Sequence, residues 1–375
     1  MKKVVLIAEA MLGGIRQHVF DITLGLDKKE YDVYLIYSDL RADETFFSQL
    51  DELNKNVTLI KCNEMLREIG AYDIKAYKRI TSILREIKPD IVHCHSSKAG
   101  IVGRLAAKRC GVKRIIYTPN AYAFQSPDIS NVKKCIYVMA ERFLAKYATD
   151  LTISVSKGER EQALRYKLDK PNKFELIYNA IPEVEIPSKA ELRKRIGLSN
   201  DIKYVGFTGR CAAQKDPFTF LNIAKEIIAR RENVEFMYIG DGELQEQMQD
   251  WVDENGLKSQ IHLLGFRKDA SEIVGALDVY LSTALYEGLP YSMIEAMRAG
   301  VPIIATDCVG NNELVIEKRN GMLFPIKDIE TGVTCVLDQL YEKKIRSQDV
   351  IDTFKETFSI EKMINRLMMI YTESV

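Results

Sequence analysis

The chain alternates short apolar, β-branched runs with segments of helical periodicity along almost its entire length. Near-continuous apolar strands between helices are typical of a parallel sheet that is covered by helices on both faces. The first half predicts six such strands, at residues 4–8, 33–37, 57–60, 91–93, 114–118 and 151–155. Helical patterns separate most of them, for example at 74–87 and 99–109. This half therefore predicts one doubly wound α/β domain.

The alternation breaks once and then begins again. Residues 178–187 contain two prolines and no periodicity, which indicates a linker. Beyond it we expect strands at 204–208, 234–239, 261–264, 279–282 and 302–305, helices at 217–230, 244–255 and 290–299, and an amphipathic helix at 360–371. The predicted organisation is a Rossmann-like domain over 1–182, a second one over 183–358, and a terminal helix, 359–375, that packs back on the first domain.

Composition agrees with a globular protein of about two domains, because 46% of the 375 residues are hydrophobic and 28% are charged. The first residues resemble a weak signal peptide, but Glu9 interrupts the apolar run, so a first strand is the better interpretation. No apolar stretch is long enough to span a bilayer. Seven scattered cysteines without a C-x-x-C pair favour reduced thiols. We therefore expect a cytoplasmic protein.

The charge is balanced overall but divided unevenly along the chain. The first 180 residues hold 30 basic and 22 acidic residues, and the remainder holds 23 basic and 31 acidic residues. Much of the basic excess lies between Lys98 and Lys146. A basic half favours an anionic partner, which is a membrane surface, a phosphorylated acceptor or nucleic acid, and an ordinary solvated face is the alternative. No recognisable motif supports nucleic-acid binding.

Parallel sheets bind ligands at the carboxyl ends of their strands, and the strongest chemical motif stands there. Residues 286–295 read Tyr-Glu-Gly-Leu-Pro-Tyr-Ser-Met-Ile-Glu, so Glu287 follows a strand and Glu295 falls inside the helix that begins near Pro290. The N–H groups and positive end of a helix start suit a phosphate or sugar hydroxyls. Two interpretations of Glu295 stay open: a buried carboxylate that accepts vicinal hydroxyls, or a surface glutamate of an amphipathic helix.

In each domain, the loop after the first strand is a further candidate. Gly209 and Arg210 follow one strand, and Lys215 precedes the next helix. An arginine fork and a lysine in one loop can clamp a diphosphate, and two solvated cations are the alternative. Gly13 and Gly14 let the backbone approach a ligand closely, unless they form a plain tight turn. This loop lacks the G-x-G-x-x-G spacing, which disfavours a nicotinamide-cofactor site.

Histidines and small turns complete the candidate residues. His93 and His95 end a strand and are expected to share one face, because side chains alternate along a strand. No further ligands cluster nearby, so we expect no metal. His95 is the candidate for hydrogen bonding a substrate, while His93 can be structural. Gly240 and Gly242 form a turn able to admit a base or ribose, and 310–314 place polar groups after a strand, with ordinary surface turns as the alternative.

Together, in chain order, the glutamate pair, the Gly-Arg…Lys loop, the Gly-Gly loop and the His-x-His strand resemble the retaining glycosyltransferases of family 4. Segments 95–100 and 118–124 resemble bacterial enzymes of capsular, exopolysaccharide or O-antigen assembly. The resemblance covers nearly the whole chain. It implies the GT-B fold, in which two facing Rossmann-like domains hold the active site in the cleft between them. The N-terminal domain would bind the acceptor and the C-terminal domain the nucleotide-sugar donor.

The resemblance also implies roles for individual residues. Arg210 and Lys215 would stabilise the leaving nucleoside diphosphate, Glu295 would bind the ribose, and Glu287 and His95 would contact the transferred sugar and the reacting centre. The implied catalytic residues are His95, Glu287, Arg210 and Lys215. The implied donor-binding residues are Gly13, Gly14, Gly209, Arg210, Lys215, Gly240, Gly242, Leu289, Pro290, Tyr291, Ser292 and Glu295. No metal or other cofactor is implied, because arginine and lysine supply the positive charge.

The implied reaction moves a hexose or N-acetylhexosamine from a nucleotide diphosphate sugar, UDP-sugar first, to a glycan acceptor in surface polysaccharide biosynthesis. Three alternatives stay open: a 2-epimerase or an inverting transferase of the same fold, and a nucleotide-sugar-binding module without turnover. The chain departs from the family pattern at 15–18, after Asn179 and at Pro290. These departures leave acceptor contacts and sugar specificity open.

A polyprenyl-diphosphate-linked sugar at the inner face of the cell membrane is the expected acceptor. The basic half motivates it, and the candidate helix 131–147 combines cationic and apolar residues in a way that suits interfacial docking. The cationic residues are Lys133, Lys134, Arg142 and Lys146, and the apolar residues are Ile136, Tyr137, Met139, Phe143 and Leu144. The alternative is that these apolar residues face the core.

Overall fold

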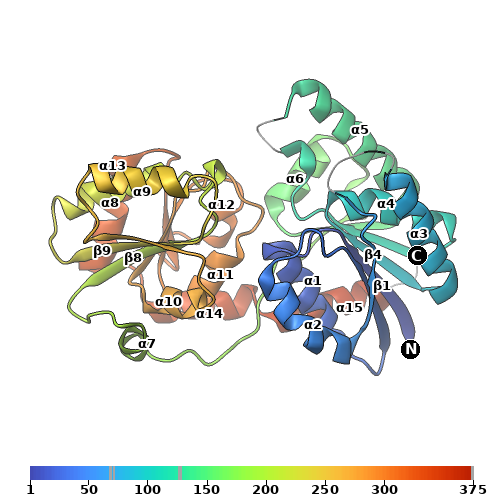
Figure 1. Cartoon of the computed structure of the whole chain (residues 1–375), viewed down its shortest axis with the longest axis horizontal. Coiled ribbons are helices and arrows are strands. Elements are labelled where there is room, and N and C mark those ends of the chain that lie inside the picture. The colour runs from blue at the N-terminus through green and yellow to red at the C-terminus, as the bar shows by residue number, and fades with distance from the viewer. Residues whose placement is uncertain (67–69, 71, 126–128, 373–375) are drawn as a thin grey trace. The chain divides into compact units, whose positions relative to one another are not determined.

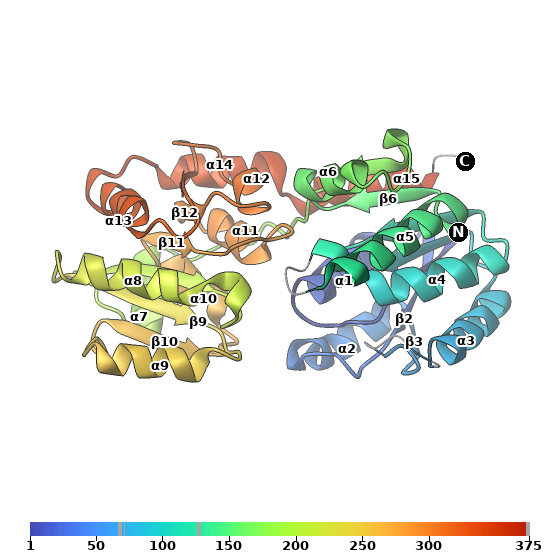
Figure 2. The same cartoon turned by 90° about the horizontal axis from the view of Figure 1, so that it is seen from above.

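The computed structural model describes residues 1–66, 70, 72–125 and 129–372. The chain forms two compact units (Figures 1 and 2): Met1–Asn179 together with Ile360–Val375, and Ala180–Ser359. Each unit is built on one sheet whose paired strands all run parallel, with helices on both faces. The predicted α/β fold class is therefore confirmed.

The first unit has a seven-stranded sheet in the order β3-β2-β1-β4-β5-β6-β7. The strand order reverses between β1 and β4, which is where open α/β sheets bind ligands. The centre of the sheet is dry, since residues 4–8 of β1 are fully buried. The strands are β1 (Lys2–Ala8), β2 (Tyr31–Tyr37), β3 (Thr58–Lys61), β4 (Ile91–His95), β5 (Arg114–Thr118), β6 (Leu151–Ser154) and β7 (Phe174–Leu176).

Helices cover both faces of this sheet. Helices α3, α4 and α5 lie side by side on one face, and α1 packs against α2 and α15 (Figure 2). The helices are α1 (Gly13–Gly25), α2 (Glu44–Asn56), α3 (Tyr72–Ile87), α4 (Ser97–Arg109), α5 (Asn131–Ala148), α6 (Lys157–Arg165) and α15 (Ile360–Thr372), with 3-10 turns at Ala123–Gln125 and Pro171–Lys173. Helix α15 follows the second unit in sequence but belongs to the first.

The second unit has six strands in the order β10-β9-β8-β11-β12-β13. Figure 1 shows α8, α9 and α13 on one side of this sheet and α7, α10 and α14 on the other. The strands are β8 (Lys203–Thr208), β9 (Val234–Ile239), β10 (Ile261–Gly265), β11 (Val279–Ser282), β12 (Ile303–Thr306) and β13 (Gly321–Phe324). The helices are α7 (Lys189–Ile196), α8 (Pro217–Ile228), α9 (Gln245–Glu254), α10 (Ala270–Ala276), α11 (Tyr291–Arg298), α12 (Asn311–Leu314), α13 (Ile329–Leu337) and α14 (Ser347–Thr357), with a 3-10 turn at Ala213–Lys215 and a π-helical turn at Asp338–Glu342.

A fully buried cation ties two helices of the first unit to the sheet. Arg104 of α4 donates from Nη2 to Glu141 Oε2 of α5 at 2.8 Å, and its guanidinium lies 3.7 Å from the ring centroid of Tyr117 on β5. The Tyr117 hydroxyl donates to the other Glu141 oxygen at 3.1 Å, and Arg104 Nε donates to the Gly100 carbonyl oxygen at 2.6 Å. Because each charge is paired and hydrogen-bonded, the cluster is tolerated in the core.

We predict that Glu141→Ala lowers the free energy of unfolding of the first unit by about 3–5 kcal/mol, because it leaves Arg104 buried without its counter-ion. The double change Arg104→Met with Glu141→Leu should cost less than half as much, since it removes both charges. Urea unfolding followed by circular dichroism measures both. Trp251, the chain's one tryptophan, lies on α9 of the second unit, so its fluorescence transition should not move. An equal loss in the single and double variants would contradict the prediction.

Candidate functional site

A half-buried ion pair stands at the carboxyl-terminal edge of the second sheet. Lys215 follows β8, Glu287 follows β11, and these two strands are hydrogen-bonded neighbours. The amine and the carboxylate are paired, with only 17% and 9% of the two side chains exposed. Gln214 reinforces the pair, since its amide nitrogen donates to the Tyr286 carbonyl oxygen at 2.9 Å and lies 3.4 Å from Glu287 Oε2. The structure therefore brings two of the predicted catalytic residues into direct contact.

Three loops fix the position of Glu287. Its backbone N–H donates to the Val309 carbonyl oxygen at 2.8 Å, in the loop after β12. Gly310 in that loop has a φ of +93°, and a Cβ there would lie 2.7 Å from both Glu287 Cβ and its carbonyl oxygen. From the loop after β8, the Gln214 carbonyl oxygen accepts from the Leu285 N–H at 2.8 Å. The carboxylate is thus held in place before any ligand arrives.

Helix α11 begins beside this pair. It starts at Tyr291 after Pro290, close to the predicted start, and so presents its first N–H groups and its positive end to the same edge. The Tyr280 hydroxyl lies 2.9 Å from Ser292 Oγ and 3.1 Å from the Thr208 carbonyl oxygen, which joins the helix start to β8. Glu295, one turn into the helix, is half-buried, which lies between the buried carboxylate and the surface glutamate that the sequence left open.

The predicted clamp of Arg210 and Lys215 is divided between two glutamates. Arg210 is exposed and pairs with Glu243, with its Nε and Nη2 atoms at 3.2 and 2.9 Å from Glu243 Oε2. Lys215 pairs with Glu287 instead. Both cations lie on the loop after β8, but Arg210 is the solvated one and Lys215 the enclosed one, as their different exposure indicates.

At Gly240 and Gly242 the sequence predicted a turn able to admit a base or ribose, with an ordinary surface turn as the alternative, and the structure shows that backbone packing requires both glycines. Their φ angles are +139° and +152°. A Cβ on Gly240 would lie 2.1 Å from the Gly209 carbonyl oxygen, and one on Gly242 would lie 2.5 Å from the Cys211 carbonyl oxygen. The Cys211 N–H donates to the Asp241 carbonyl oxygen at 2.7 Å across this contact. These two glycines therefore allow the loop after β9 to lie directly against the loop that carries Arg210.

We predict that Gly240→Ala lowers the free energy of unfolding of the second unit by at least about 3 kcal/mol, because it combines a strained φ with a clash against backbone. Trp251 fluorescence during urea unfolding measures this. Gly256→Ala is the matched control: its φ is also positive, at +67°, but apart from Gly256 and its two chain neighbours no atom of the described residues lies within 4 Å of the point that its Cβ would occupy. That variant should lose only about 1 kcal/mol. Equal losses would show that φ alone matters.

The first sheet places three histidines together at its own carboxyl-terminal edge. The rings of His93 and His95 share a face as predicted, with centroids 4.1 Å apart. His93 is structural in its contacts, since Nδ1 lies 2.8 Å from the Tyr371 hydroxyl and Nε2 lies 2.8 Å from Thr118 Oγ1. His95 is fully buried, and neither ring nitrogen has a hydrogen-bond partner among the described residues. His95 therefore retains hydrogen-bonding capacity that His93 has used.

Sequence reasoning missed the third histidine, His18 of α1, whose ring centroid lies 5.4 Å from that of His95. The available signal was its place five residues after Gly13, on the inward face of the helix. Burial lowers the pKa of His18 to about 4, and burial with the neighbouring histidines lowers the pKa of His93 and His95 well below 6.5. All three rings are thus neutral at pH 7. The part of the chain that the structure describes holds no group of three or more residues able to bind a metal ion.

The histidine cluster predicts acid sensitivity. The unfolded chain protonates His18 near pH 6.5, and the folded chain does so only near pH 4. The stabilising contribution is therefore complete above pH 6.5 and is lost as the pH falls toward 4. At pH 5, His18 alone should account for about 2 kcal/mol of the loss. The difference in unfolding free energy between pH 7.5 and pH 5 should shrink by that amount in His18→Gln. Identical pH dependence in His18→Gln and wild type would contradict it.

The predicted Gly-Gly loop starts α1, but one of its N–H groups already has a partner. Gly13 has a φ of +53°, and its N–H donates to Asp43 Oδ2 at 2.9 Å. Arg16 Nε donates to the same oxygen at 3.1 Å. An anion at this helix start would therefore have to displace Asp43 or bind through Gly14 and the residues beyond it.

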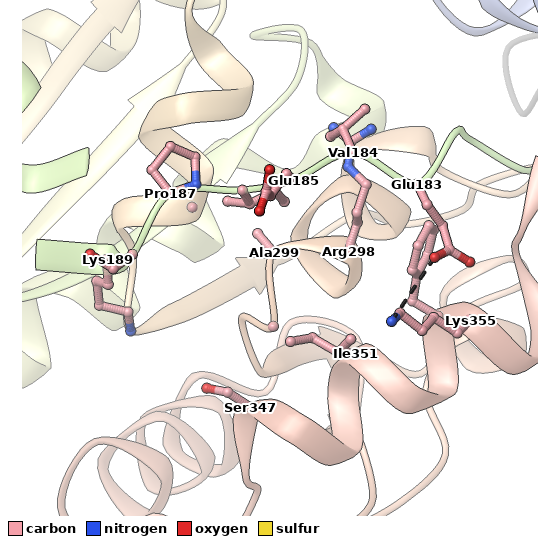
Figure 3. A pocket seen from close by; sticks show the side chains of 15 residues that line it. Glu183, Val184, Glu185, Pro187, Lys189, Arg298, Ala299, Ser347, Ile351 and Lys355 are labelled. Atoms are coloured by element: carbon pink, nitrogen blue, oxygen red, sulfur yellow. Dashed lines mark ion pairs between the residues drawn. The ribbon is translucent and has the colours of Figure 1, made fainter. Parts of the chain in front are cut away.

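A cavity of about 570 Å³ lies elsewhere in the second unit. The linker residues 183–189, the end of α11 and one face of α14 line it, with Arg298, Ile351 and Lys355 among its walls (Figure 3). Helices α10 and α11 end there, directly before β11 and β12 begin, so it lies at the amino-terminal edge of the sheet. None of the predicted site residues lines it, and cavity size therefore does not identify the site.

Comparisons with known proteins decide the family. A family model described as Glycosyltransferase Family 4 matches residues 12–184, and one described as Glycosyl transferases group 1 matches residues 202–342. The chain is 30% identical over 365 residues to the UDP-Gal:alpha-D-GlcNAc-diphosphoundecaprenol alpha-1,3-galactosyltransferase of Escherichia coli, covering 93% of this chain and 91% of that protein. The chain belongs to glycosyltransferase family 4.

Two further comparisons agree with this assignment. The chain is 23% identical to the capsular polysaccharide biosynthesis glycosyltransferase CapM of Staphylococcus aureus, over 88% of this chain and 84% of that protein. The structure of Anabaena HepE in complex with UDP and glucose superposes with a TM-score of 0.82 at 17% identity, covering 100% of both chains. The resemblance drawn from the sequence is thereby confirmed, and so is the GT-B fold.

Proposed function

We propose that this family 4 glycosyltransferase transfers a hexose or N-acetylhexosamine from a UDP-sugar to a lipid-linked glycan acceptor, with retention at the anomeric carbon. The observation that carries the proposal is the half-buried Lys215–Glu287 pair beside the start of α11. A fixed ammonium group and a helix start at one sheet edge suit a diphosphate, and a carboxylate beside them suits sugar hydroxyls.

The relatives support the choice of substrates. The name of the Escherichia coli relative gives UDP-Gal as the donor, a sugar on diphosphoundecaprenol as the acceptor and an alpha-1,3 linkage as the product. The anomeric bond of UDP-galactose is itself α, so an α product corresponds to retention. HepE has been solved with UDP and glucose. A UDP-sugar and an acceptor carried on a polyprenyl diphosphate are therefore the proposed substrates of this chain.

In the proposed reaction, the bond between the anomeric carbon and the β-phosphate oxygen breaks, and its electron pair leaves with UDP. The acceptor oxygen forms the new bond to the anomeric carbon, and its proton passes to the departing diphosphate. Lys215, Arg210 and the start of α11 stabilise the negative charge that develops on UDP, which is the main electrostatic task. These groups supply the positive charge that a metal ion would otherwise provide.

The remaining residues position the donor in this proposal. Glu287 keeps Lys215 in place in the free enzyme and contacts the sugar once a donor binds. Half-buried Glu295 accepts the ribose hydroxyls, and Leu289–Ser292 contribute backbone to the phosphate and sugar. His95, neutral and without a hydrogen-bond partner among the described residues, has the capacity to hydrogen-bond a substrate without adding charge.

We predict that UDP raises the unfolding free energy by about 2.7 kcal/mol at one hundred times its dissociation constant. The other nucleoside diphosphates should stabilise less. Lys215→Ala and Glu287→Ala should each lower the rate of donor hydrolysis or transfer by at least about a hundredfold, because each removes a contact to the transition state. Thermal-shift assays with UDP, GDP, ADP and dTDP and their sugars, followed by product analysis, measure this.

Arg319→Ala is the matched control, because it breaks an exposed ion pair with Glu356, also in the second unit, at 2.8 Å. It should leave UDP stabilisation and turnover unchanged. Near-wild-type turnover in Lys215→Ala or Glu287→Ala would remove that residue from the catalytic set. Stabilisation by UDP without any hydrolysis or transfer would favour a binding module, and a β-linked product would favour an inverting transferase.

A further inference from the structure

Helix α5 exposes a continuous apolar stripe. Its five members lie four, three, four and four residues apart, so they follow one face of the helix along its whole length. Between 54% and 70% of each residue is exposed. This α5 stripe consists of Val132, Ile136, Met139, Phe143 and Tyr147. The rings of Phe143 and Tyr147 stack, with centroids 5.3 Å apart, which makes one end of the stripe a flat aromatic surface.

The opposite face of α5 supplies the core, so the stripe is not needed there. Val138, Leu144, Ala145 and Ala148 are buried, and Glu141 is anchored to Arg104. The sequence left open whether the apolar residues of this helix face inward. The structure divides them: Leu144 is buried, whereas three of the expected docking residues, Ile136, Met139 and Phe143, face outward.

Cations flank the α5 stripe, and the helix, which the structure describes from end to end, exposes no carboxylate. Lys133 and Lys146 are exposed next to the stripe, and half-buried Arg142 lines a shallow hollow with Met139, Phe143, Lys146 and Tyr147. The carboxylate that α5 carries, Glu141, is buried and paired with Arg104. From the adjacent helix, Lys108 Nζ lies 5.7 Å from the centroid of the Tyr147 ring. The surface is therefore apolar along its middle and positive along its borders.

We propose that the α5 stripe docks this protein on an anionic lipid bilayer, with α5 lying in the plane of the interface. The apolar side chains enter the boundary between headgroups and acyl chains, and the flanking lysines meet lipid phosphates. Among the described residues, no helix has both the length and the apolarity to cross a bilayer. Docking is thus peripheral, through one face of a helix whose other face is held in the core.

Charge favours a lipid surface over a second copy of the chain. A symmetric dimer through the α5 stripe would bring the same lysines of both copies together, because a two-fold interface pairs each patch with itself. Like charges across an interface are repelled, whereas an anionic bilayer neutralises them. The inference does not rest on the proposed reaction, although a lipid-linked acceptor would be reached from such a surface.

Flotation of the full chain with lipid vesicles tests the proposal. The protein should float with phosphatidylglycerol-containing vesicles at low ionic strength, and vesicles of phosphatidylcholine alone, or added salt, should lower the bound fraction. Met139→Ser with Phe143→Ser should lower the partition coefficient between vesicles and water by at least about tenfold, because apolar burial is lost. Lys133→Glu with Lys146→Glu should weaken it by a similar factor through lost attraction.

Met369→Ser is the matched control, because Met369 is 56% exposed on α15 of the same unit but lies outside the stripe. It should float like wild type. Absence of flotation at low ionic strength, or flotation of Met139→Ser with Phe143→Ser at the wild-type level, would overturn the proposal. If the wild-type protein forms a concentration-dependent dimer and Met139→Ser with Phe143→Ser is a monomer, the stripe is instead an interface with a second copy of the chain. Stabilisation of each variant by UDP, measured without vesicles, shows that the variant is folded and that its donor site is intact. Failure of the docking proposal is therefore distinguishable from failure of the proposed function.

Discussion

Parallel pairing of every strand is the constraint on which the rest of this molecule depends. Two neighbouring parallel strands cannot be joined by a tight turn, so each connection crosses the sheet and the chain returns to the same edge. The loops after β8, β11 and β12 therefore meet, although Lys215, Glu287 and Gly310 are far apart in sequence. The same rule gathers His93 and His95 with His18 at the corresponding edge of the first sheet. Candidate chemistry occurs in both units at the edge that topology selects.

Electrostatics then distinguishes the members of each group. Lys215 is enclosed with Glu287 between loops, and Arg210 five residues earlier is exposed to solvent with Glu243. An enclosed cation acts on a ligand without first giving up much hydration, while an exposed one must be ordered at some entropic cost. In the first unit, burial keeps the histidines neutral, so that edge offers hydrogen bonds rather than charge. The two edges therefore have different chemical character.

The sequence predicted much of this, and its failures have physical reasons. Most of the apolar strands were clear, but β7 and β13 were not predicted, and β7 has only three residues, too few for a pattern to emerge. From the sequence, Lys215 and Glu287 could be placed only at the same edge of one sheet. Whether their side chains pair depends on side-chain geometry, which the sequence does not give. His18 lay on a helix without a motif, and Gly240 appeared to be an open turn because its tight neighbour, Gly209, is distant in sequence. Both faces of α5 are apolar, so periodicity alone could not say which one the core takes.

The place of α15 has a consequence for synthesis on the ribosome. The second unit is one uninterrupted stretch of chain, whereas the first is completed only by residues that are translated after it. His93 must wait for Tyr371, 278 residues later, before its ring nitrogen has a buried partner. The second unit can thus fold while the first is still unfinished, with part of its sheet uncovered where α15 will pack. The second unit can therefore complete its fold before the first, although it is translated later, and the first unit stays open to chaperones and proteases until α15 packs.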